Sequence, residues 1–115
     1  MSISKIKTSD GTTHLINHIT TSEHTGNSTD YTIASMEPNV YYRILDVKKL
    51  TITAFKSGET GFCNNYMLEV RFKGGNTLSL PTGITWANGN TPTFVAGGVY
   101  QISIINNLGV FTKFN

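Results

Sequence analysis

Apolar and polar residues alternate in short runs along most of the chain. The clearest run is residues 66–72, where Tyr66, Leu68, Val70 and Phe72 share one face of an extended strand and the residues between them share the other. No segment repeats apolar residues at the i, i+3, i+4, i+7 spacing of an amphipathic helix over several turns. The pattern therefore predicts an all-β protein whose strands bury one face.

Turn-forming residues divide these runs into short strands. Asp10-Gly11, between two short runs near the N-terminus, predicts a β-hairpin, and residues 73–76 (KGGN) predict a tight turn after which the chain returns. The strands expected comprise residues 3–8, 12–17, 31–36, 40–47, 50–55, 66–72, 77–80, 99–105 and 110–114. Their spacing is typical of a sandwich, jelly roll or small barrel, and we expect a jelly-roll-like antiparallel β-sandwich of about eight strands with an N-terminal hairpin.

The chain divides into two regions on this pattern. Residues 20–30 contain no large apolar residue and are expected to form a polar loop. We therefore expect an N-terminal hairpin with this loop over residues 1–29, followed by the β-sandwich module over residues 30–115.

The only tryptophan, Trp86, lies in a stretch rich in glycine, asparagine and proline, residues 80–94. It continues the alternation of Leu78, Leu80 and Ile84, so its ring is expected to point inward and cap one end of the core. Tryptophan is also favoured at binding hot spots, so a ligand platform is the alternative role.

Composition and charge narrow the possible functions. The 115 residues suffice for one domain with a modest core, and the formal charge of +2 comes from scattered basic residues, which argues against a nucleic-acid surface. Cys63 is the only cysteine, so it is a packing residue or a free thiol, and no intramolecular disulfide is possible. No apolar run resembles a signal peptide or approaches the ~20 residues that span a bilayer, so we expect cytoplasmic synthesis and no membrane contact.

Residues that could carry chemistry form no local signature. His14 and His18 are four residues apart, which on a strand separates them by about 13 Å, too far to share a metal ion. A metal site that adds His24, Glu23 or Asp30 is the remaining alternative. No carboxylate is joined to a histidine or serine in a hydrolytic motif. We expect no catalytic, cofactor-binding or metal-binding residue, and hence no enzyme.

Two places are candidates for contact with a protein or a glycan. Tyr41 and Tyr42 are adjacent, so on a strand one ring faces inward and the other outward, where it either binds a partner or pairs with a neighbouring strand. The loop that follows Trp86 supplies the other candidates, Asn88, Asn90 and Thr91.

Five elements follow one another between about residue 36 and the C-terminus. They are Pro38-Asn39 before Tyr41 and Tyr42; Leu50 to Thr53; Asn65-Tyr66 through Phe72; Leu78, Leu80, Pro81, Ile84 and Trp86; and Tyr100, Ile102, Ser103 and Ile104. In this order they resemble a module of bacteriophage structural proteins of the tail-fibre, baseplate and head-fibre or capsid-decorating type. The N-terminal KIKTSDGTTHLI also resembles a hairpin of such proteins, with His14 where an aromatic residue is usual.

The resemblance implies a β-sandwich virion component, made in the bacterial host cytoplasm, that has no catalytic activity. It also implies self-association, with a trimer favoured, and contact with other virion proteins. Fibre proteins of this kind are usually longer, so the small size favours a head-fibre, auxiliary capsid or tail accessory protein that decorates or extends the capsid or tail. The alternative is a receptor- or carbohydrate-binding module of a tail fibre, which would bind a glycan of the host surface.

Overall fold

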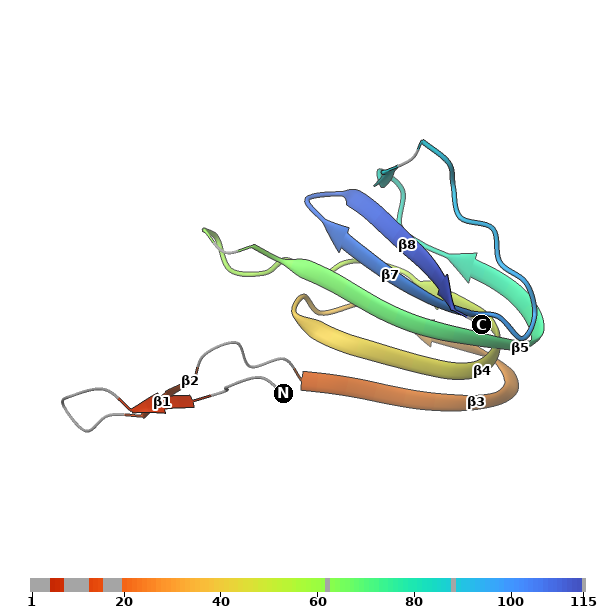
Figure 1. Cartoon of the computed structure of the whole chain (residues 1–115), viewed down its shortest axis with the longest axis horizontal. Helices are drawn as coiled ribbons and strands as arrows, with labels where there is room; N and C mark the ends of the chain where they lie inside the picture. The colour runs from red at the N-terminus through yellow and green to blue at the C-terminus, as the bar shows by residue number, and fades with distance from the viewer. Residues whose placement is uncertain (1–4, 8–12, 16–19, 62, 88, 115) are drawn as a thin grey trace.

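The computed structural model describes residues 5–7, 13–15, 20–61, 63–87 and 89–114. The regular structure among them consists of strands, so the all-β prediction is confirmed. The strands are β1 (Lys5–Lys7), β2 (Thr13–Leu15), β3 (Thr20–Ile33), β4 (Val40–Ile52), β5 (Asn65–Ser79), β6 (Thr85–Trp86), β7 (Val99–Ile105) and β8 (Leu108–Phe114) (Figure 1).

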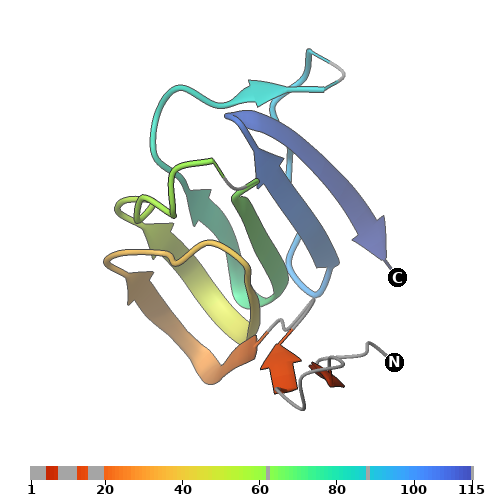
Figure 2. The ribbon, with the colours of Figure 1, turned by 90° about the vertical axis from the view of Figure 1, so that its left-hand side faces the viewer.

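These strands form two sheets. β1 and β2 pair antiparallel, with Lys5 opposite Leu15, as the hairpin prediction requires; the expected turn at Asp10-Gly11 lies outside the described residues. The other strands form a six-stranded sheet in the order β3-β4-β5-β7-β8-β6. Figure 2 shows β3, β4, β5, β7 and β8 side by side across this sheet.

The six-stranded sheet is mixed, so the antiparallel direction expected from the sequence is wrong for the β3–β4, β4–β5 and β6–β8 pairs. β4 runs parallel to both β3 and β5, whereas the β5–β7 and β7–β8 pairs are antiparallel. Parallel neighbours normally need a crossover of about a dozen residues or more. Here β3, β4 and β5 each bend and double back (Figure 1), so the short connection of residues 34–39 suffices to start β4 beside the beginning of β3.

Each bend contains a residue in the left-handed backbone region. The φ angle is 54° at Asn27, 58° at Asp46 and 75° at Gly74, and the register between neighbouring strands shifts beside these residues. Asparagine, aspartate and glycine are the residues that tolerate this conformation best. The chain thus turns back at residues 73–76, as expected, with Gly74 in the positive-φ conformation. The turn is a corner within the continuous strand β5, however, and the two halves of β5 pair with β4 and β7, so a hairpin at this position is wrong. For the same reason residues 40–52 form one bent strand.

The polar loop expected at residues 20–30 is also wrong, because these residues form most of β3. β3 is an edge strand with β4 as its one neighbour in the sheet, so its polar side chains can face water while its backbone pairs with β4. Gly26 lets the two strands approach closely, since a Cβ atom there would lie 2.6 Å from Cγ1 of Val47. The boundary expected between residues 29 and 30 accordingly falls inside a strand.

The core lies inside the bend of the sheet, and its members are apolar or tyrosine. They are Ile33, Met36, Tyr42, Ile44, Val47, Leu50, Ile52, Leu68, Val70, Phe72, Tyr100, Ile102 and Ile104. Two of the buried tyrosines also hold connecting segments in place. The Tyr42 hydroxyl accepts a hydrogen bond from the Glu37 N–H, and the Tyr100 hydroxyl accepts one from the Val95 N–H, each at 2.8 Å. The core thus fixes both the start of β4 and the segment that leads into β7.

Candidate functional site

The two adjacent tyrosines of β4 point to opposite faces, as the alternation predicts. Tyr42 is buried, so it is wrong as a candidate contact residue. Tyr41 lies on the outer face, where its hydroxyl donates to Oε1 of Glu69 at 2.6 Å and accepts from Nε2 of Gln101 at 3.1 Å. Partial burial, and then the hydrogen bond to Glu69, raise the pKa of Tyr41 above its usual value. Its ring is therefore held in one place on the surface.

A row of polar side chains continues from Tyr41 across the outer face. The strand register places Glu23, Arg43, Glu69 and Gln101 opposite one another on β3, β4, β5 and β7. Nε of Arg43 lies 3.1 Å from Oε2 of Glu69, and its Nη1 lies 3.7 Å from Oε1 of Glu23. Because Arg43 is exposed, each pair contributes at most about 1 kcal/mol to stability. The row consists of mutually paired groups and ties four strands together.

The corner of β4 carries a second, stronger ion pair. Nε and Nη2 of Arg71 donate to the two carboxylate oxygens of Asp46 at 2.8 and 3.0 Å, the bidentate geometry that arginine favours with carboxylates. These hydrogen bonds are the main reason that the pKa of Asp46 lies below its ordinary value of 3.8. Asp46 has a positive φ angle, so the pair joins a bend of β4 to β5.

This pair predicts a pH dependence. A carboxyl group whose pKa is lowered in the folded state stabilises the fold above its unfolded pKa, and that contribution disappears as the pH falls below about 4 through the lowered value. We expect Arg71→Gln to raise the Asp46 pKa towards its ordinary value, as measured by NMR titration of the side-chain carboxyl carbon. Lys73→Gln is the control, since Lys73 has a weaker influence on Asp46; an equal rise in both variants would contradict the assignment.

The loop after Trp86 is described in part. Asn88 lies outside the described residues, and Asn90 and Thr91 are exposed. Thr91 is a lining residue of a pocket in the structure, whereas Asn90 lies away from the lining. Of the four contact candidates that the structure describes, Thr91 is the one that lines this pocket.

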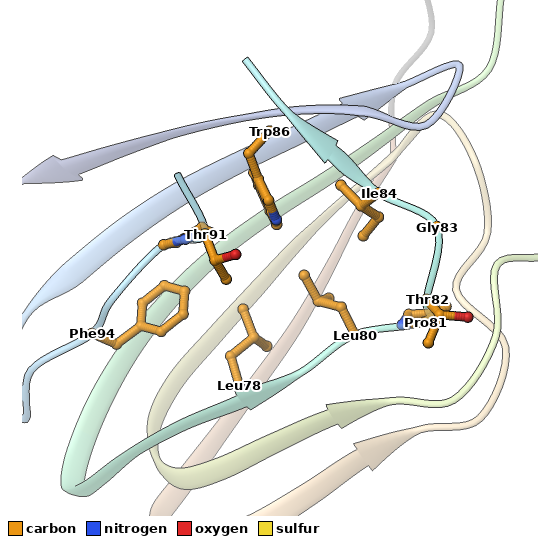
Figure 3. Close-up of a pocket in the computed structure, with 10 residues that line it drawn as sticks. Leu78, Leu80, Pro81, Thr82, Gly83, Ile84, Trp86, Thr91 and Phe94 are labelled. Atoms are coloured by element: carbon orange, nitrogen blue, oxygen red, sulfur yellow. The ribbon is translucent and has the colours of Figure 1, made fainter. Parts of the chain in front are cut away.

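The pocket lies beside the end of β5 (Figure 3). Leu78 and Leu80 project into it from β5 and the residue that follows, Ile84 and Trp86 lie across from them, and Phe94 flanks one side. Its volume is about 360 Å³, within the ~300–1,000 Å³ range of small-molecule sites. On one side, this part of β5 pairs with β4, where Leu50 is opposite Leu78. The pocket lies on the other side of this part of β5.

Trp86 is both packed on the sheet and a wall of the pocket. β6 holds it opposite Gly109 of β8, where a Cβ atom would come within 2.6 Å of the indole Cε3 and Cζ3 atoms. The ring also meets Phe111 edge to face, with 6.2 Å between the centroids. Figure 3 shows the nitrogen end of the indole pointing into the pocket. The inward orientation expected from the alternation and the alternative role as a platform are therefore compatible.

Only part of this pocket was predictable from the sequence. Leu78, Leu80, Ile84 and Trp86 were identifiable from their alternation, but Phe94 lies beyond the glycine- and asparagine-rich segment that separates it from Trp86. Its position beside the pocket depends on contacts with Phe72 and Tyr100, whose ring centroids lie 5.5 and 4.8 Å away. Such contacts between distant segments leave no periodic trace in the sequence.

A second surface feature lies on the outer face of the last hairpin, and we call it the apolar edge. It consists of Ile105, Leu108, Val110 and Phe114, with 41–51% of each side chain exposed. The register places Ile105 opposite Leu108, so the four residues share the face opposite buried Ile102 and Ile104. β6 pairs with only the first two residues of β8, which leaves the rest of that strand at the margin of the described sheet.

The remaining candidates for chemistry are placed as follows. Cys63 is exposed as a free thiol. Histidine, cysteine, aspartate and glutamate side chains form no group of three or more within the described part of the chain. Nor do the described residues include a helix that could cross a membrane. Comparison of the chain with models of protein families, with curated proteins and with solved structures gives no match.

Proposed function

We propose that the protein is a non-enzymatic structural component of a bacteriophage virion that decorates or extends the capsid or tail. The order of sequence elements from Pro38 to Ile104 supports this class of protein. The apolar edge is the structural observation that carries the proposal, because it offers a surface through which identical copies can associate. In this proposal the protein is a head-fibre, auxiliary capsid or tail accessory protein, assembled into the particle after synthesis in the bacterial cytoplasm.

The apolar edge suits contact with another copy better than exposure to water. Contiguous exposed apolar side chains on a strand at the margin of a sheet favour association, because burying them is stabilising and the free backbone groups can pair with another strand. Symmetry then makes the same patch available on every copy. We favour a trimer, and the repeated copies on a particle would convert weak contacts with other virion proteins into firm attachment.

The finer architecture is part of the same proposal. The bent second halves of β3, β4 and β5 fold back over the first halves around the core (Figure 1). We propose that this arrangement acts as a compact sandwich-like unit, so that copies stack as rigid bodies.

Replacing Val110 with glutamate tests the self-association. A charge at the centre of the apolar edge would be buried without a partner on association, so we expect at least a tenfold weaker assembly by sedimentation equilibrium. Thr21→Glu is the control, because Thr21 lies in the same cross-strand row through Tyr41, Met67 and Ser103 but at the opposite margin. A wild-type monomer at all accessible concentrations, or equal weakening by both substitutions, would contradict the proposed interface.

The alternative function is a receptor- or carbohydrate-binding module of a tail fibre, and the pocket beside Trp86 is the observation that favours it. Saturable binding to a glycan array or to whole host cells would support this alternative. Binding to purified capsids or tails, without binding to cells, would support the structural role.

A further inference from the structure

Beyond the proposed structural role, the pocket beside Trp86 has chemistry that selects a ligand. Its ten lining residues are Leu, Ile, Phe, Trp, Pro, Gly and Thr, so the walls supply no charged group. A charged ligand would lose its hydration there without gaining an ionic partner, which is costly. The ligand that suits these walls is therefore neutral.

Few polar side chains line the pocket. Trp86 is held from behind by Gly109 and Phe111, and the nitrogen end of its indole points into the pocket, where the N–H can donate a hydrogen bond. The Thr91 hydroxyl lies near the nitrogen end of the indole in Figure 3 and can either donate or accept. Thr82 stands near the other end of the pocket. The pocket thus combines one donor, the indole N–H, with an adaptable hydroxyl above the apolar floor of Leu78 and Leu80.

We infer that this pocket binds the acetamido group of a neutral N-acetylated hexosamine, as found in a surface glycan. The methyl group packs against Leu78, Leu80 and Phe94. The carbonyl oxygen accepts the hydrogen bond of the Trp86 indole N–H, and the amide N–H donates to the Thr91 hydroxyl. The sugar ring remains at the open mouth, where its hydroxyls keep their contact with water.

A sugar without the acetamido group fits the pocket less well. A hydroxyl in place of the acetamido group would either face the leucine floor without a hydrogen-bond partner or leave the floor unfilled. An acetylated lysine side chain offers the same amide and methyl group, but its long aliphatic stem, and not a hydroxyl-rich ring, would occupy the open mouth in contact with water. We therefore favour the sugar, and an acetyl-lysine peptide is a separate arm of the test.

The single tryptophan makes the test specific, because all indole fluorescence of the chain comes from the pocket wall. We expect tri-N-acetylchitotriose to produce a saturable change in Trp86 emission, whereas cellotriose, which carries a hydroxyl in place of each acetamido group, produces none. Saturation-transfer NMR on the same samples provides a readout that does not depend on how strongly the ligand perturbs the indole.

A variant localises the binding. Thr91→Val keeps the shape of the side chain and removes its hydroxyl, so we expect affinity to fall about three- to tenfold, the usual effect of one hydrogen bond. Thr93→Val is the matched control, since Thr93 is exposed on the same segment and outside the lining. The inference is overturned by equal responses to cellotriose, by tighter binding of an acetyl-lysine peptide, by no response to chitotriose in either readout, or by equal losses in the two variants. None of these results bears on the apolar edge, whose test is the assembly of the Val110 variant.

Discussion

Replacement of Phe72 by alanine is expected to lower the free energy of unfolding by about 3–5 kcal/mol, the usual cost of removing a buried phenylalanine side chain. Phe72 has no exposed surface, and its ring contacts those of Phe94 and Tyr100, with centroids 5.5 and 6.2 Å away. Its backbone also links β5 to the segment that precedes β7, because the Gly97 N–H donates a hydrogen bond to the Phe72 carbonyl at 2.8 Å. Urea denaturation followed by Trp86 fluorescence measures the change.

The loss of stability should be much larger for a buried phenylalanine than for an exposed one. Phe114→Ala is the matched control, because the Phe114 side chain is 47% exposed on the apolar edge. In dilute, monomeric protein we expect its loss to cost less than about 1 kcal/mol, in line with most surface substitutions. Since domains of this size are stabilised by only about 5–15 kcal/mol, the Phe72 variant retains little stability. Similar costs for both substitutions would mean that the core is not arranged as described.

Gly75→Ala is expected to destabilise the protein by about 1–3 kcal/mol or more, as overpacking typically does. A Cβ atom at Gly75 would lie 2.5 Å from the backbone oxygen of Lys48 and 3.0 Å from its C and Cα atoms. Backbone atoms cannot rotate away, so β4 and β5 must separate at their shared corner. Denaturation midpoints in urea give the change in stability.

Gly58→Ala provides the comparison for this prediction. The three atoms nearest to a Cβ atom at Gly58 all belong to the side chain of Asn64, which can rotate, so we expect a change within about 0.5 kcal/mol. If Gly75→Ala were as harmless as Gly58→Ala, the parallel packing of β4 against β5 at this corner would be wrong.

The buried faces of the strands were predictable because alternation records burial directly. Residues 66–72 and 99–105 pair within the sheet and turn Leu68, Val70 and Ile102 inward, as expected from their spacing. Alternation records which side of a strand is dry, but not which strand lies beside it or in which direction. Local pattern therefore establishes the strands and leaves the topology open.

The strand directions were not predictable, because turn-forming residues suit both a hairpin, whose two strands pair with each other, and a bend within one continuous strand. Gly74 and Gly75 suit a hairpin, yet here they form a bend inside the continuous strand β5. Gly74 adopts the left-handed backbone conformation, and Gly75 lets the backbone of β4 approach closely. Only contacts with Lys48 of the neighbouring strand distinguish the two outcomes. The polar edge strand at residues 20–30 was missed for a related reason, since a strand that pairs through its backbone needs few apolar side chains.

The candidate site was predictable to the extent that it used local pattern. Trp86 was predicted to point inward, with a ligand platform as the alternative, and Thr91 was a candidate contact residue. The pocket that both residues line also needs Phe94, which long-range packing brings to the end of β5. Tyr42 shows the converse, since only the structure distinguishes the buried tyrosine of the adjacent pair from the partly buried one on the outer face.

The most direct test of the proposed function is quantitative mass spectrometry of purified particles released by the bacterium that expresses this chain. A virion structural component is predicted to co-purify with the particles through repeated density gradients, at a fixed copy number that is a multiple of three if the trimer is correct. Abundant protein in the lysate together with its absence from the purified particles would contradict the virion role.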